Sequence, residues 1–122
     1  MKRFALALVT LVVCAGAQAA SDEVEMNLVT SQGVGQSIGT VKITETDKGL
    51  EFAPDLKALP PGEHGFHVHA KGSCQPALKE GKPSAAEAAG GHLDPQHSGK
   101  HEGPNGMGHL GDLPVLVVKI GR

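Results

Sequence analysis

The chain has 122 residues and a formal net charge of −2 at pH 7, from 11 basic and 13 acidic side chains. This length allows one domain with a thin apolar core. Aromatic residues make up only 2% of the sequence, and the basic residues form no evident patch. The chain therefore lacks the clustered cations and the stacking side chains by which proteins bind nucleic acids. We therefore expect no nucleic acid partner.

The first 19 residues have the three parts of a secretory signal peptide. Lys2 and Arg3 form a charged start, residues 4–13 are almost entirely apolar, and Ala17 and Ala19 have the small-x-small spacing of a cleavage site. The apolar run is shorter than the roughly 20 residues that a membrane-spanning helix needs. We predict cleavage after Ala19, a single domain over residues 20–122, and no membrane attachment after cleavage.

Cysteine usage bears on this predicted export. Cys14 lies in the predicted signal peptide, so Cys74 alone would remain in the exported domain. Small domains in oxidising compartments commonly carry a disulfide. A single cysteine there indicates an intermolecular bond, a free thiol or a missing partner.

Short segments in which apolar and polar side chains alternate indicate half-buried β-strands. They recur about every 12 residues, which predicts an antiparallel sandwich or barrel. Gly39 is typical of a β-bulge. The expected strands cover residues 23–30, 38–46, 50–52, 65–70 and 113–118, with turns at 31–37, 47–49 and 60–62 and one helical turn between Ser84 and Gly90.

Residues 90–112, here called the metal loop, are interrupted by glycine and proline throughout, which excludes a regular helix or central strand. A flexible, solvated loop that binds metal loosely is one interpretation. We favour a specific site, because long loops without secondary structure are usually functional or disordered. Three imidazoles and one carboxylate would make a closed tetrahedral set that suits Zn²⁺. The predicted ligands are His92, His101, His109 and Asp112, with His97 and Asp94 as spares.

A second group of donors lies on the predicted strand at 65–70. His67 and His69 would share one face of this strand, because side chains alternate along it. Alone, such a pair is a weak signal, but the metal loop follows closely. His92 or His97 would complete a nitrogen-only site, which suits copper. We predict a structural role for His64.

His92 can serve both sites. An imidazole that loses both protons has two nitrogens that can bind two cations, and two adjacent divalent charges favour that loss. The sequence thus predicts a copper site and a zinc site that share His92.

The motifs GFHVHAKGSC, GGHLDP, KHEGP and GHLGDLP resemble those of the bacterial, periplasmic branch of the Cu/Zn superoxide dismutases. The resemblance covers nearly all of the predicted domain and implies an eight-stranded Greek-key barrel, or sandwich, with a long metal-binding loop. It also implies a periplasmic location, as a monomer or homodimer. It matches His67, His69 and His92 to copper ligands, and His92, His101, His109 and Asp112 to zinc ligands. Cys74 matches the first cysteine of the family's intrachain disulfide.

The resemblance implies dismutation of superoxide to dioxygen and hydrogen peroxide, with copper as the redox ion and zinc redox-silent. His92 would release copper on its reduction and take up a proton for the peroxide. Because the chain is acidic overall, local positive charge would have to steer the superoxide anion. Lys71 and Lys100 are our candidates for that role.

The family pattern continues beyond Arg122, with a fourth copper histidine, the second cysteine, an arginine that guides superoxide and the last strands of the barrel. We therefore expect an incomplete barrel that still binds metal although its catalysis is impaired. One alternative is a fragment that holds zinc or copper without turnover. Another is a zinc hydrolase, which ranks last because Asp112 closes the coordination position that hydrolysis needs.

Overall fold

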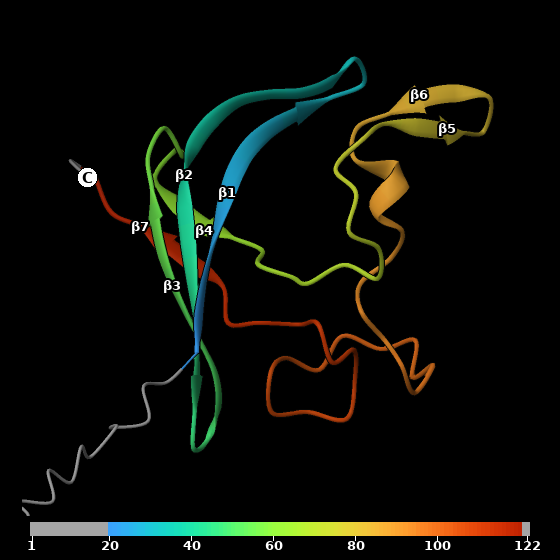
Figure 1. The fold of residues 1–122 in the computed structure, drawn as a ribbon. Helices are drawn as coiled ribbons and strands as arrows, with labels where there is room; N and C mark the ends of the chain where they lie inside the picture. Colours follow the sequence, from blue (N-terminus) through green and yellow to red (C-terminus); the bar gives the residue numbers. More distant parts are fainter. Residues whose placement is uncertain (1–19, 121–122) are drawn as a thin grey trace, which may run out of the picture.

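The computed structural model describes residues 20–120 and is built almost entirely from strands and connecting loops (Figure 1). This confirms the predicted all-β class. The predicted signal peptide lies outside the described residues. The elements in chain order are β1 (Ser21–Thr30), β2 (Gly33–Thr46), β3 (Gly49–Leu56), β4 (Gly62–His64), β5 (Ala77–Lys79), β6 (Lys82–Ser84), the 3-10 helix η1 (Glu87–Ala89) and β7 (Leu116–Val118).

The largest unit is the antiparallel sheet β1-β2-β3. The predicted bulge at Gly39 is confirmed, because the register of β1 on β2 shifts beside it. A Cβ at this position would overlap the carbonyl oxygen of Asp55 on β3, so the close approach of the two strands requires glycine. The hairpin between β2 and β3 is also confirmed, and the hydroxyl of Thr46 closes it by donating to the Gly49 carbonyl at 2.8 Å.

The turn predicted over residues 31–37 is wrong in its length. β1 ends at Thr30 and β2 begins at Gly33, so the turn proper has only two residues. The Asn27 side-chain amide donates to the Gly35 carbonyl at 3.2 Å and helps to hold the glycine-rich start of β2 against β1. Backbone pairing therefore extends through a segment whose composition is typical of a loop.

Two short antiparallel pairs complete the strands: β4 pairs with β7, which is distant in sequence, and β5 forms a hairpin with β6. The β5–β6 pair was not predicted, because strands of three residues are too short to show alternation. Glu80 and Gly81 turn the chain there, with positive φ angles of 52° and 77°. The predicted helical turn is present as η1 and ends at Gly90 as expected, but no side chain caps its start.

Two predicted strands are shorter than expected. Regular pairing ends at His64 on β4, and only isolated bridges follow at His67 and His69, so no continuous strand covers residues 65–70. The partners there are single residues of the metal loop, whose glycines and prolines prevent a longer ladder. The strand expected over 113–118 is reduced to β7, because Pro114 has no N–H to donate.

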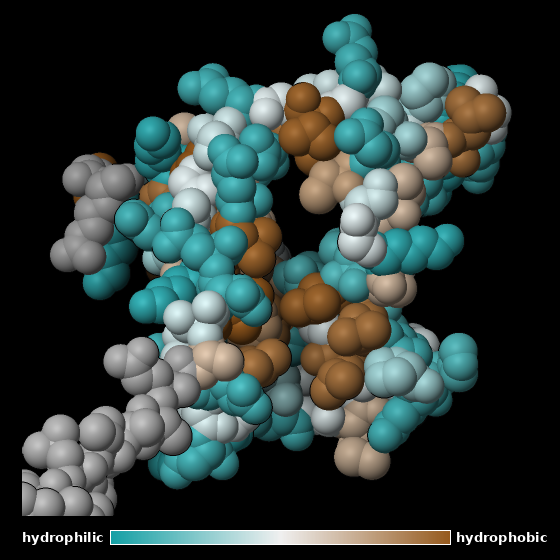
Figure 2. Space-filling model, viewed as in Figure 1, coloured by the Kyte–Doolittle hydropathy of each residue, from teal (hydrophilic) through white to brown (hydrophobic). Residues whose placement is uncertain are grey.

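Apolar side chains gather along the hollow between the sheet and the rest of the molecule (Figure 2). The buried apolar residues of the described region are few, namely Ile38, Val41 and Ala89. Val24 and Leu28, which the alternation in residues 23–30 placed on the buried face of the strand, are 44% and 47% exposed. The core is thus as thin as the composition predicted. Within residues 20–120, no helix has the length and apolar character to cross a membrane.

Candidate metal centre

The segment around Val68 is held on both sides by the metal loop. His67 forms an isolated antiparallel bridge with Asp112, and His69 forms one with His92. Val68 donates its N–H to the Gly111 carbonyl and accepts from a loop N–H, both at 2.8 Å. The backbone therefore brings the predicted ligands together although they lie up to 45 positions apart in the sequence.

Gly111 makes this three-way backbone contact possible. Its N–H donates to the Leu93 carbonyl at 2.9 Å, while its own carbonyl accepts from Val68. A Cβ at Gly111 would overlap the Val68 carbonyl oxygen and lie 3.0 Å from the Leu93 side chain. Only glycine fits here, because backbone approaches the position closely on two sides. This role was not predicted from the sequence, in which Gly111 is one of several glycines in the metal loop.

Asp112 is the centre of the site. Its side chain is 5% exposed and lies among four imidazoles. Its Oδ1 is 3.2 Å from the Nδ1 atoms of both His67 and His92 and 3.7 Å from Nδ1 of His109. Its Oδ2 lies 3.3 Å from Nδ1 of His101. One buried carboxylate is thus the common neighbour of ring nitrogens from four histidines.

The electrostatics of the site favour an ionised Asp112 carboxylate and a neutral His92 imidazole. Burial alone would raise the pKa of Asp112, but the hydrogen bond from His101 and the charges of His101 and His109 outweigh it and lower the pKa. Burial lowers the pKa of His92, and the neighbouring His67 and His69 lower it further. Ionised carboxylate and neutral imidazole are the forms that bind metal.

The predicted zinc ligands form one compact group. One donor atom from each of His92, His101, His109 and Asp112 lies within 4.8 Å of the other three. Three nitrogens and one oxygen suit tetrahedral zinc. The buried Nδ1 of His109 makes no hydrogen bond, which is costly for a polar atom unless it has another partner. These residues therefore fit a metal ion.

The predicted copper donors lie beside this group. The ring of His67 stacks on that of His92, with centroids 3.8 Å apart, and the ring of His69 stands edge-on to His92 at 5.1 Å. Nδ1 of His69 lies 2.9 Å from the Gly90 carbonyl, which can only accept a hydrogen bond. Nδ1 therefore carries the proton, and Nε2 keeps the lone pair that a metal needs.

The other predicted residues lie apart from this arrangement. Nε2 of His64 donates to the Pro60 carbonyl at 2.7 Å, in agreement with the structural role predicted for it. His97 is exposed, with a φ of 53°. Cys74 is exposed and is a free cysteine within residues 20–120. Lys71 and Lys100 are exposed too, and their predicted role in steering stays a prediction.

Comparison with known proteins identifies the family. The family model for copper/zinc superoxide dismutase (SODC) matches residues 37–122, which is more than half of the chain. The copper-zinc superoxide dismutase of Escherichia coli K12 is 82% identical over 118 residues, covering 97% of this chain and 68% of the relative.

Two solved structures are similar in fold. The solution structure of the monomeric copper, zinc superoxide dismutase from Salmonella enterica has 78% identity and a TM-score of 0.72, covering 81% of this chain and 64% of that one. The enzyme from Brucella abortus has 48% identity and a TM-score of 0.77, covering 80% and 64%. The chain thus spans about two thirds of the length of these relatives, and its fold is of their type. Together with the compact group of imidazoles around Asp112, these matches show that the chain belongs to the bacterial copper/zinc superoxide dismutases.

Proposed function

We propose that this chain is an oxidoreductase that dismutes superoxide in the periplasm at a copper site joined to a zinc site by His92. The observation that carries the proposal is the position of this ring. Its Nδ1 faces Asp112 and the zinc set, while His67 and His69 pack against its other sides. One imidazole is thereby in contact with both groups of donors.

The residues form two proposed metal sites. His92, His101, His109 and Asp112 would hold zinc, and His67, His69 and His92 would hold copper. Copper supplies the one-electron redox chemistry when bound, and zinc supplies a fixed positive charge. Asp112 orients the imidazoles, since its two oxygens face four of their nitrogens at 3.2 to 3.7 Å.

His92 also has a role in proton transfer. With its Nδ1 directed toward the zinc set, its Nε2 would hold a proton whenever that nitrogen is not bound to metal. It would donate this proton to the peroxide product, and solvent would supply the second. Two superoxide ions and two protons then give one dioxygen and one hydrogen peroxide.

Superoxide removal by the metal-loaded chain tests this proposal. The chain is loaded with zinc and copper, and turnover is expressed per bound copper beside the full-length E. coli relative. We expect turnover that His69→Ala abolishes and that His97→Ala, in the exposed spare histidine, leaves unchanged. Equal turnover in the two variants would contradict the assignment. Recovery of the chain by osmotic shock would support the periplasmic location, and recovery only with spheroplasts would contradict it.

A second function is favoured by one observation. Among residues 20–120, the compact group of four donors is the proposed zinc set. The proposed copper set has three imidazoles, one fewer than the four that the family resemblance implies. The chain would then hold zinc or copper without turnover. Metal bound in stoichiometric amounts with no superoxide removal supports this second function over the first.

A further inference from the structure

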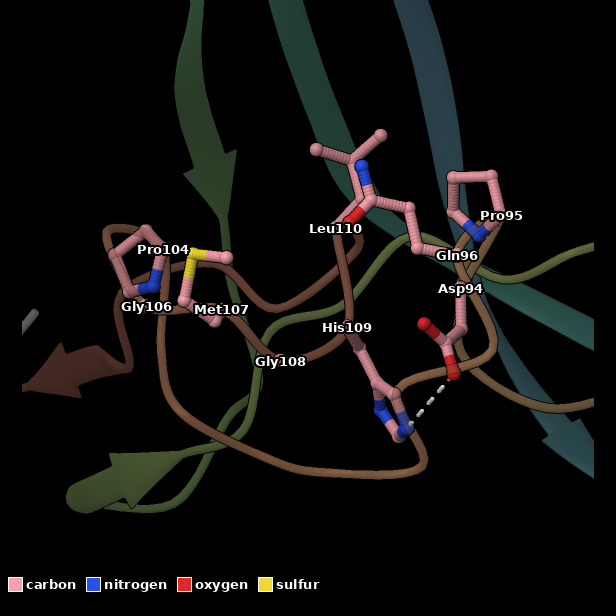
Figure 3. A pocket seen from close by; sticks show the side chains of 9 residues that line it. All are labelled: Asp94, Pro95, Gln96, Pro104, Gly106, Met107, Gly108, His109 and Leu110. Atoms are coloured by element: carbon pink, nitrogen blue, oxygen red, sulfur yellow. Dashed lines mark ion pairs between the residues drawn. The ribbon is translucent and has the colours of Figure 1, made fainter.

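Asp94, a spare in the predicted zinc set, lies outside the compact donor group but faces one of its members. Its Oδ2 is 3.7 Å from Nε2 of His109, and both side chains are mostly buried, at 16% and 14% exposed. They lie together at a cavity of about 220 Å³ between residues 94–96 and 104–110 (Figure 3). Asp94 therefore approaches His109 from the side opposite Asp112.

The carboxylate of Asp94 is fixed in place by its own loop. Oδ1 accepts hydrogen bonds from the N–H and the hydroxyl of Ser98, both at 3.0 Å. Oδ2 accepts from the N–H of Gly99 at 2.9 Å. All three donors point at the carboxylate oxygens, as an ionised carboxylate requires. An ionised carboxylate can only accept hydrogen bonds, so it favours a proton on the His109 nitrogen that faces it.

The other nitrogen of His109 is the one that needs a partner. Nδ1 is buried, makes no hydrogen bond and lies 3.7 Å from Oδ1 of Asp112. The His109 backbone is anchored separately, since its N–H donates to the Lys100 carbonyl at 2.8 Å. The orientation of the ring about this anchor is therefore set by its two nitrogens, and Asp94 is the group beside Nε2.

We propose that Asp94 is a positioning residue for the zinc site: it holds Nε2–H of His109 and so presents the Nδ1 lone pair to the ion. This inference rests on the zinc site of the proposed function. A carboxylate behind a metal-binding histidine fixes the ring and its tautomer, and its loss typically weakens metal binding about 10- to 100-fold. A shift of well under 1 Å would turn the present ion-pair distance into a hydrogen bond.

The test measures zinc affinity of the full chain by competition with a chromophoric chelator. Asp94→Ala and Asp94→Asn are compared with Asp55→Asn, which makes the same change in an exposed aspartate of β3. We expect affinity to fall about 10- to 100-fold in both Asp94 variants and to stay close to wild type in Asp55→Asn. Asp94→Asn keeps the side chain's size, so it separates loss of the carboxylate from loss of packing.

A second readout distinguishes positioning from a general structural role. In the zinc-loaded protein, the Nε2 proton of His109 should be visible by NMR and slow to exchange, and it should exchange rapidly in Asp94→Asn. Wild-type affinity in both Asp94 variants would overturn the inference, as would an equal loss in Asp55→Asn. Failure of the wild-type chain to bind zinc would instead overturn the zinc site itself, together with the role of Asp94 in it.

Discussion

The sheet β1-β2-β3 and the metal loop are ordered by different kinds of interaction. The sheet relies on continuous backbone pairing between strands that adjoin in sequence, with eight paired positions between β2 and β3. The metal loop has no such ladder in residues 90–112. It relies on single backbone bridges, on one glycine with no room for a side chain, and on two carboxylates that face imidazoles.

This difference has a consequence for stability. Changes in the sheet should alter folding without altering metal affinity, because its hydrogen bonds are local. Changes at the few contacts of the metal loop should alter both, since the ligands depend on them for their positions. Metal binding should in turn stabilise the loop, because an ion that binds only the folded chain shifts the folding equilibrium.

The largest effect is expected for Asp112→Ala. Four imidazoles face this buried carboxylate, so its removal takes away a proposed zinc ligand and the group that orients the rings. We expect zinc affinity, measured by chelator competition, to fall by more than the roughly 100-fold upper value for groups that only support a ligand. Asp55→Ala on β3 is the matched control, and its zinc affinity should stay near wild type. Similar losses in both variants would contradict this role.

Gly111→Ala should have the next largest effect. The added Cβ overlaps the Val68 carbonyl, so the loop must move away from His67 and His69. Overpacking of this kind costs about 1 to 3 kcal/mol, which urea unfolding of the metal-free chain would measure. Copper and zinc affinities should both fall. Gly72→Ala is the control, because nothing lies within 4 Å of a Cβ at that position. Equal stability of the two variants would show that the close approach does not matter.

The stability of the metal-free chain should fall as the pH falls. The pKa of His92 is held below its ordinary 6.5, so the unfolded chain binds a proton more readily than the folded chain and stability falls as the pH drops below about 6.5. The pKa values of Asp94 and Asp112 are held below 3.8, so their contribution is complete above that value and is lost as the pH falls through the folded-state values. Urea midpoints between pH 8 and 3 would measure both steps.

His92→Gln separates these two steps. This variant should lack the loss of stability that begins near pH 6.5 and keep the loss that begins near pH 3.8, since the carboxylates of Asp94 and Asp112 remain. A urea midpoint of the wild-type chain that rises on acidification from pH 7 to pH 5 would contradict the lowered pKa of His92.

The smallest effect is expected in the sheet. Thr46→Ala removes the hydroxyl that donates to Gly49 and accepts from the Lys48 N–H at 3.2 Å. Exposed hydrogen bonds of this kind contribute about 0.5 to 1.5 kcal/mol each, so the urea midpoint should fall slightly. Zinc affinity should not change. A change in affinity would show that the sheet and the metal loop are coupled more tightly than their contacts indicate.

The sequence singled out side chains that the structure brings together, whereas several of the strands it predicted differ in the structure. The ligand types and the glycine-rich spacing pointed to His92, His101, His109 and Asp112, and the structure brings these four together. The sheet was predicted from alternation, which is strong in β1 and β2. Alternation did not reveal β5 and β6, because each strand has only three residues. Composition was misleading for residues 31–37, because pairing to β1 extends through a segment that is typical of a loop.

The roles of Gly111 and Asp94 were not predicted, because they depend on three-dimensional contacts. Gly111 was one of several glycines in the metal loop, and only the approach of Val68 and Leu93 distinguishes it. Asp94 is 15 positions from His109, and nothing in that spacing shows that they face each other. The turn that binds Ser98 and Gly99 to Asp94 is a local signal that could have shown at least that its carboxylate is fixed.

The most direct test of the shared imidazole is a crystal structure of the chain loaded with zinc and copper, with anomalous diffraction measured at both metal edges. We predict two metal peaks on opposite sides of the His92 ring, with zinc about 2.0 to 2.1 Å from Nδ1 and copper bonded to Nε2. A zinc peak among His101, His109 and Asp112 with no copper bonded to His92, or two peaks that both lie away from this ring, would contradict the account.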